Sequence, residues 1–221
     1  AANKPSKIVK LFAGRDTSTI LLWRRDSRAV IELTDDLIPL CREQGFSSLL
    51  TSGTLVRDGA LIAQDKEEEI AIKPWEPAWL RVTGSQSYVT GHLARSVDAH
   101  LKTGDIDAGM RLLAEALARV ESTDERYCEA ELHRLKGELL GTRDRDAEAE
   151  QSFRTAIRIA QGQSAKSFQL RATISLARLL NAQGKHDEAL TMLADIYGWF
   201  TEGFDTADLK EAKALLDELS A

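Results

Sequence analysis

Cysteine is scarce in this sequence, and so are proline and aromatic residues. The 221 residues include two cysteines, four prolines and 6% aromatic residues. Cys41 and Cys128 form no Cys-x-x-Cys pair, so neither a zinc site nor a redox couple is indicated, and we expect buried or half-buried free thiols. Few prolines and few aromatics suit an all-helical chain. No apolar run approaches the ~18 residues of a membrane span, so we expect no membrane segment and a cytoplasmic protein.

The sequence also lacks the motifs of catalysis and cofactor binding. It has no Gly-x-x-x-x-Gly-Lys-Ser/Thr phosphate loop, no Gly-x-Gly-x-x-Gly turn and no His-Glu-x-x-His pair. Glu129 and His133 have the i, i+4 spacing of two metal ligands, but a solvated helix pair is the interpretation we favour. We therefore expect no catalytic residue, no cofactor, no metal and no enzyme activity. The net charge of −6 argues against direct nucleic-acid binding and against an anionic membrane surface.

A regular repeat runs through the sequence. Steps of 40 from Leu193 reach Phe153 and Leu113. The same step from Ala189 reaches Ala149. Successive segments thus keep small or apolar side chains on one helical face. A fixed period of this kind is typical of stacked helical repeats, because one helix pair cannot bury its apolar stripe alone.

The repeat resembles the tetratricopeptide motif. Gly137, Ala149, Phe153 and Ala156 have the spacing of that motif's small-residue, Ala, Phe and Ala positions. We predict an all-α fold: a right-handed α-solenoid of about five tetratricopeptide-like helix-turn-helix repeats of period 40, with a C-terminal capping helix. An unrelated helical bundle is the alternative, and the regularity of the spacing over several steps argues against it.

The helix pattern predicts where each element lies. Helices are expected at 27–44, 46–64, 86–102, 107–121, 124–140, 146–161, 165–183, 187–200 and 207–219. Pro39 predicts a kink or an early helix end, and Pro74 and Pro77 predict an irregular segment at 73–79. The last helix is expected to have an apolar stripe and a charged side formed by Lys210, Glu211, Lys213, Asp217 and Glu218.

Three parts follow from this pattern. Residues 1–24 are an N-terminal edge with a partial helix, 25–203 are the repeat array, and 204–221 are the capping helix. The sequence begins without methionine and is expected to be a piece of a longer protein.

One wall of such a solenoid is lined by the first helix of each pair. With Gly137 as the helix contact, the predicted partner groove consists of Arg134, Arg171, Arg178 and Asn181. Arginine forks bind carboxylates through paired, charge-assisted hydrogen bonds, so the groove suits a carboxylate or an acidic peptide. The plainer interpretation has more weight: these are ordinary surface arginines, many of them paired with nearby glutamates.

Two segments carry a more specific resemblance, YCEAELHRLKGELL at 127–140 and YGWFTEGFDTADLKEAK at 197–213. They resemble the C-terminal tetratricopeptide-repeat region of large bacterial proteins with an AAA-like (STAND-type) ATPase module. Members of that group often carry an adenylate/guanylate cyclase domain or a winged-helix DNA-binding domain in front. The resemblance covers roughly 25–221 and implies a sensor or docking arm that controls the ATPase switch. The prolines at 73–79 depart from the group's continuous helix.

The leading functional hypothesis is a non-catalytic protein–protein interaction or regulatory module. Its partner would be a protein or peptide, or the parent's own ATPase or cyclase domains. An alternative is that the chain contributes to a nucleotide cyclase or ATPase holoenzyme in trans. A third hypothesis is self-association through Trp75 and Trp79.

Overall fold

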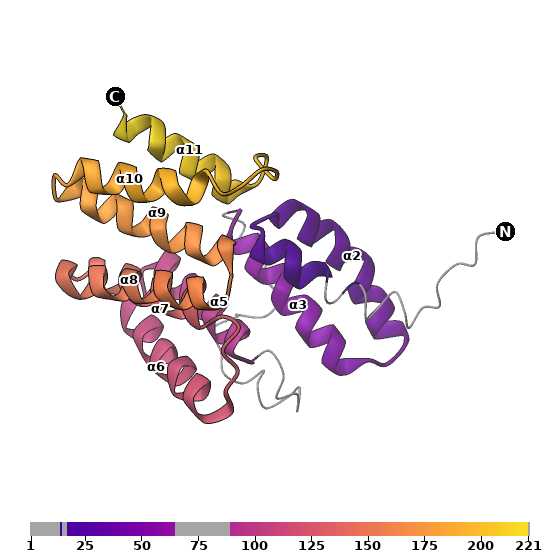
Figure 1. Ribbon diagram of the computed structural model, residues 1–221. Coiled ribbons are helices and arrows are strands. Elements are labelled where there is room, and N and C mark those ends of the chain that lie inside the picture. The colour runs from indigo at the N-terminus through magenta and orange to yellow at the C-terminus, as the bar shows by residue number, and fades with distance from the viewer. Residues whose placement is uncertain (1–13, 15–16, 65–88, 221) are drawn as a thin grey trace. The chain divides into compact units, whose positions relative to one another are not determined.

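The computed structural model describes residue 14 and residues 17–64 and 89–220 (Figure 1). The predicted irregular segment at 73–79 and most of the predicted N-terminal edge lie outside the described residues. The chain divides into two compact units, Ala1–Val89 and Thr90–Ala221. Every element within the described ranges is a helix, which confirms the all-α prediction there.

The first unit contains a pair of helices, α2 (Ser27–Glu43) and α3 (Ser47–Ile62), which pack against each other. Asp26 begins α2, because its carboxylate accepts a hydrogen bond from the backbone N–H of Ala29 at 3.1 Å. Side chains buried in this unit include Val30, Leu37, Cys41, Val56 and Ala60.

Pro39 lies inside α2 and does not end it. The helix continues to Glu43. Of the two outcomes expected at this proline, the early end is therefore excluded.

The second unit is a stack of helices that follow one another along the chain (Figure 1). These are α5 (Val89–Thr103), α6 (Ile106–Thr123), α7 (Glu129–Gly141), α8 (Asp146–Gly162), α9 (Lys166–Ala182), α10 (His186–Tyr197) and α11 (Ala207–Leu219). From α6 onward each helix packs against the next, and α9 also packs against both α7 and α11. Contacts between consecutive and alternate helices define an α-solenoid, so the predicted fold class is confirmed.

The turns between first and second helices repeat as the helices do. Gly104, Asp144 and Gly184 follow one another at the predicted period, and their φ angles are all positive, at 79°, 56° and 76°. A single left-handed residue ends a helix and reverses the chain direction. The second helices accordingly begin at Ile106, Asp146 and His186, with the predicted period of 40.

The turn before α7 corrects one expected boundary. A helix was expected from residue 124, but α7 begins at Glu129. Asp124 has a positive φ of 57°, and its N–H donates to the carbonyl of Val120 at 3.0 Å. Asp124 therefore closes α6 instead of opening α7.

The core of the second unit lies where first and second helices touch. A Cβ placed on Gly137 would lie 2.4 Å from Cε1 of Phe153, closer than two carbons can approach. A glycine is thus required where this ring packs on α7, as the small-residue position of the repeat predicted. Ala177, the corresponding residue of α9, is fully buried.

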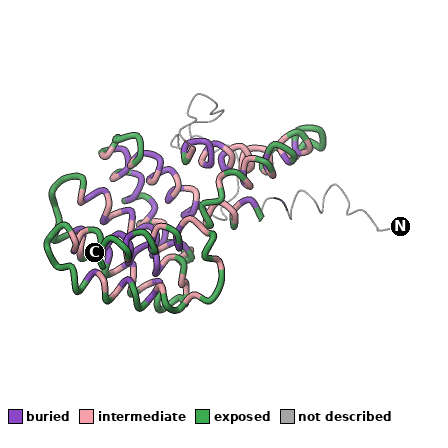
Figure 2. Tube along the Cα trace, turned by 90° about the horizontal axis from the view of Figure 1, so that it is seen from above, coloured by how far each residue is buried: buried purple, intermediate pink, exposed green. Residues whose placement is uncertain are grey.

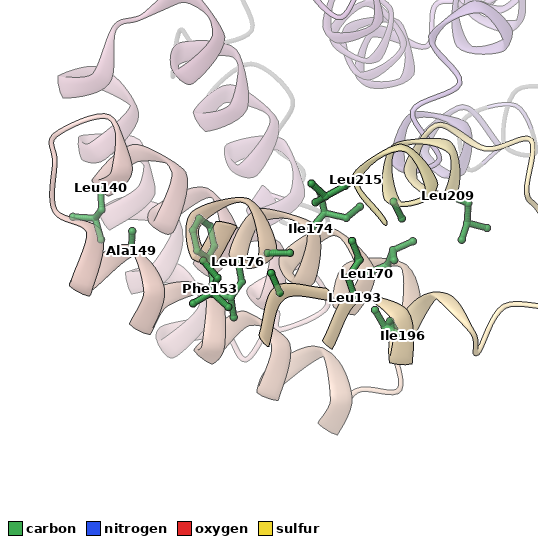
Figure 3. Close-up of a cluster of buried hydrophobic side chains, with 14 residues drawn as sticks. Leu140, Ala149, Phe153, Leu170, Ile174, Leu176, Leu193, Ile196, Leu209 and Leu215 are labelled. Atoms are coloured by element: carbon green, nitrogen blue, oxygen red, sulfur yellow. The ribbon is translucent and has the colours of Figure 1, made fainter. Parts of the chain in front are cut away.

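Figure 3 shows the buried cluster that continues from Phe153 through Leu170, Leu176 and Leu193 toward Leu209 and Leu215 of α11. Along α6, α8, α10 and α11, buried residues recur between more exposed ones, whereas α9 is buried without a break from Gln169 to Ala177; Figure 2 shows how burial alternates along the chain. This is the amphipathic pattern from which the repeats were predicted.

Both cysteines are buried free thiols, as expected. Burial raises the pKa of Cys128 to about 12, and it also raises the pKa of Cys41. A thiol with a raised pKa carries little thiolate at neutral pH, which disfavours reaction of either cysteine as a nucleophile.

Candidate partner-binding face

The four predicted groove residues lie on the first helices α7 and α9. Arg134 belongs to α7, while Arg171, Arg178 and Asn181 belong to α9, which packs between α7 and α11. Each of the four contacts a carboxylate of the chain. We call these four residues and the carboxylates around them the first-helix face. Its carboxylates are Asp98, Glu131, Glu138, Asp208, Glu211 and Glu218.

Arg171 forms a buried ion pair with α11. Its Nε donates to Oδ2 of Asp208 at 2.8 Å, and its Nη1 lies 3.6 Å from Oε1 of Glu131. The side chains of Arg171 and Asp208 are each 9% exposed, and that of Glu131 is 7% exposed. Loss of the Arg171 side chain would remove a charge-assisted hydrogen bond from the buried Asp208 carboxylate, and the pair links α11 to α9.

Arg134 holds two carboxylates of its own helix. It donates to Glu131 through Nη2 at 2.8 Å and Nε at 3.0 Å, and to Oε1 of Glu138 through Nη1 at 3.2 Å. Asp98 of α5 lies 4.0 Å from Nη2. Burial alone would lower the pKa of Arg134, but Glu131, Glu138 and Asp98 outweigh burial and hold the pKa above its usual value.

Arg178 and Asn181 lie at the exposed end of the face. Nη1 of Arg178 donates to Oε1 of Glu211 at 2.7 Å, although the arginine side chain is 54% exposed. Nδ2 of Asn181 donates to Oε1 of Glu218 at 3.3 Å. Exposed ion pairs contribute only about 0–1 kcal/mol, so the contact between Arg178 and Glu211 adds little to stability.

Glu131 joins the buried parts of the face into one network. It binds Arg134 within α7 and lies beside Arg171 of α9. Ser175 of α9 donates to Oε1 of Glu138 at 2.6 Å. Polar contacts therefore run from α5 through α7 and α9 to α11, and they set the position of each first helix along the next.

Sequence reasoning missed the carboxylates of α11. Glu211 and Glu218 were expected on the charged side of the last helix, but both accept hydrogen bonds from α9. The sequence separation between polar residues of α9 and carboxylates of α11 could have identified these contacts. Arg171 and Asp208 are 37 residues apart, and so are Asn181 and Glu218. Complementary polar residues at nearly one repeat length indicate contacts between neighbouring first helices.

The face offers charge-assisted hydrogen bonds. Within residues 17–64 and 89–220, no group of three or more His, Cys, Asp and Glu side chains could hold a metal ion. None of the helices described has the length and apolar character of a membrane span. A guanidinium and an amide at the exposed end are groups that recognise carboxylates and peptide amides.

These observations define a helical-repeat protein of the solenoid class. No family model matches the sequence, and no curated protein matches it. Among solved structures, the chain is similar to Bacillus thuringiensis PlcR in complex with the peptide PapR7 and DNA, with a TM-score of 0.73 and 14% sequence identity. The match covers 98% of this chain and 73% of the PlcR chain. At this identity the likeness shows the fold, and the predicted ATPase or cyclase context stays a prediction.

Proposed function

We propose that this chain is a non-catalytic regulatory module that binds a protein or peptide segment on its first-helix face. One support is the fold, which is similar to that of PlcR, a protein crystallised with a peptide. The proposal rests mainly on the exposure of Arg178 and on its contact with a carboxylate. Arg178 is 54% exposed and already holds a carboxylate at 2.7 Å, so this position accepts the group that an acidic ligand would bring.

The two ends of the face have different roles in this proposal. Arg134 and Arg171 hold the helices in place through buried carboxylates. Arg178 and Asn181 contact the ligand, whose carboxylates replace Glu211 and Glu218. All four predicted groove residues thus serve binding, but only the exposed pair touches the partner.

A set of short labelled peptides tests the proposal. Three peptides share one uncharged polar sequence without aromatic or large apolar residues, so that they do not carry an apolar anchor, and they differ only in carrying glutamate, glutamine or lysine. Fluorescence anisotropy should show the glutamate peptide binding most tightly, and the double variant Arg178→Ala/Asn181→Ala should weaken it at least ~10-fold, or about 1.4 kcal/mol.

The matched control is Lys213→Ala, because Lys213 is exposed and paired with Asp217 on its own helix. This variant should bind the glutamate peptide as the unmodified chain does. Equal binding of all three peptides, or an unchanged affinity in the double variant, would contradict the proposal.

We also propose that the module is the sensor or docking arm of a larger signalling protein of the ATPase or nucleotide-cyclase type. The support is the sequence resemblance of 127–140 and 197–213. Deleting the repeats from such a parent should abolish the response of its ATPase or cyclase to the partner that the repeats bind. An unchanged response would remove this part of the proposal.

Direct DNA binding needs a separate test. PlcR was crystallised with DNA as well as peptide, so this likeness does not support the expectation that nucleic acid is avoided. The net charge of −6 supports that expectation, because a net negative chain repels the phosphates of DNA. Our proposal retains it: a labelled DNA duplex should show no mobility shift with the chain at physiological salt.

A further inference from the structure

The connection between α10 and α11 presents aromatic side chains to solvent. It spans residues 198–206, whereas residues 163–165 and 183–185 suffice for the two preceding turns. Within it Trp199 is 57% exposed and Phe204 is 46% exposed. Large exposed aromatics are costly to leave in water and are the residue types that anchor protein interfaces.

Local packing holds these two rings in place. Trp199 makes an edge-to-face contact with Phe200, with ring centroids 5.1 Å apart. Phe204 packs on Tyr197 at 5.8 Å. Tyr197 and Phe200 are themselves packed against the buried core of the unit. The exposed rings are therefore attached to a fixed support, which reduces the conformational entropy lost when a partner binds.

The connection is also acidic. No lysine or arginine occurs from Asp195 to Leu209. Glu202 and Asp205 are both exposed, and they flank Phe204 in the sequence. One cation does approach from α9: Nζ of Lys166 lies 5.4 Å from the centroid of the Trp199 ring. The ring is thus placed where it binds an ammonium group of the protein itself.

We propose that Trp199, Phe204, Glu202 and Asp205 form a second docking surface, which binds a segment of another protein carrying lysine or arginine beside an apolar anchor. The anchor packs on the two exposed rings, and the basic side chains pair with the two carboxylates. We call this the aromatic surface. Its carboxylates repel anionic lipid, so the chemistry favours a basic protein segment over a membrane.

The aromatic surface is separate from the exposed end of the first-helix face. Lys166, beside Trp199, and Arg178 are twelve residues apart on α9, which places them about 18 Å apart along the helix axis. The two surfaces also prefer opposite charges. This proposal therefore goes beyond the proposed function and does not depend on it.

A second peptide series tests the aromatic surface on the full chain. Three labelled peptides share a tryptophan and a leucine and carry lysine, serine or glutamate at the flanking positions. Anisotropy titrations use the unmodified chain, Trp199→Ala, Phe204→Ala and the charge variant Glu202→Gln/Asp205→Asn. Ile20→Ala is the control, because Ile20 is another exposed apolar side chain, at 59%, outside the aromatic surface.

The lysine peptide should bind the unmodified chain at least ~10-fold more tightly than the glutamate peptide. Trp199→Ala and Phe204→Ala should each weaken it by about 10-fold, within the range of interface anchors. The charge variant leaves both rings in place and should weaken it a few-fold, while Ile20→Ala should have no effect. Arg178→Ala/Asn181→Ala should also leave it unchanged, which separates this proposal from the first.

Two results would overturn the proposal. One is failure of the lysine peptide to bind the unmodified chain. The other is equal affinity in the unmodified chain and in both ring variants. Thermal unfolding of each variant checks the fold, and the charge variant gives an answer even if a ring substitution disturbs the connection.

Discussion

Arg171 and Arg178 lie seven residues apart on one face of α9, and each holds a carboxylate of α11, yet their surroundings differ. The Arg171 side chain is 9% exposed and that of Arg178 is 54% exposed. A similar contrast occurs on α7, where Gly137 lies under the Phe153 ring and a Cβ on Gly141 would meet open space. In both helices, the residue nearer the start is closely packed and the residue nearer the end is not.

The comparison shows why residue type alone does not define a binding site. Both arginines make hydrogen bonds of almost equal length, 2.8 and 2.7 Å. The free energy of losing each bond depends on whether water can solvate the carboxylate left behind. Burial therefore separates a structural arginine from a candidate ligand contact.

The sharpest test removes each arginine in turn. Arg171→Ala should lower the free energy of unfolding of the second unit by about 3–5 kcal/mol, because the Asp208 carboxylate loses this donor while it stays buried. Arg178→Ala, the matched control, should cost less than about 1 kcal/mol. Urea unfolding followed by circular dichroism, with hydrogen exchange to localise the change to α9 and α11, provides the measurement.

Similar losses in the two variants would break the comparison. A further variant sharpens it: Arg171→Met/Asp208→Leu replaces both charges with apolar groups and should recover most of the loss, because no charge of this pair then remains buried. A double variant less stable than Arg171→Ala would show that the pair itself, and not its burial, provides the stability.

A smaller effect is expected for the two glycines of α7. Gly137→Ala should destabilise the second unit by about 1–2 kcal/mol, because the new methyl group overlaps the Phe153 ring and outweighs the gain in helix propensity. Gly141→Ala meets open space and should be neutral or stabilising by up to ~1 kcal/mol. Thermal unfolding of both variants decides the matter, and equal shifts would argue against close packing at Gly137.

The smallest expected effect is the coupling free energy between the side chains of Arg178 and Glu211. A double-mutant cycle on Arg178 and Glu211 should give a coupling of about 0.2–1 kcal/mol at low salt, and that coupling should decrease as salt is added. Urea unfolding of the four proteins at two ionic strengths provides the cycle. A coupling well above this range that does not change with salt would mean that the Arg178–Glu211 pair is shielded from water as the Arg171–Asp208 pair is.

Much of the fold could be predicted from the sequence because it depends on local periodicity. The regular step that relates Leu193 to Phe153 describes real repeats, and Gly137 is small for the reason expected. The start of α7 could not be predicted from periodicity. Asp124 adopts the left-handed conformation that is usually recognised in a sequence by a glycine, and no glycine is present at this position.

The candidate site was less predictable. The sequence placed Arg171 and Arg178 on one face but could not separate the buried arginine from the exposed one. Exposure depends on how α11 covers α9, which is a contact between elements 33–37 residues apart. Charge pattern alone also does not separate Glu211, which binds α9, from Asp217, which binds its neighbour Lys213.

The left-handed residues at 104, 144 and 184 make the array modular. The segment between two successive positions of this kind, which we call a block, contains one second helix and the first helix that follows it. We expect that adding or removing one block keeps the helix–helix contacts of the other blocks. Under the function proposed above, the length of the bound segment would be set by the number of blocks, and it could change without redesign of any single block.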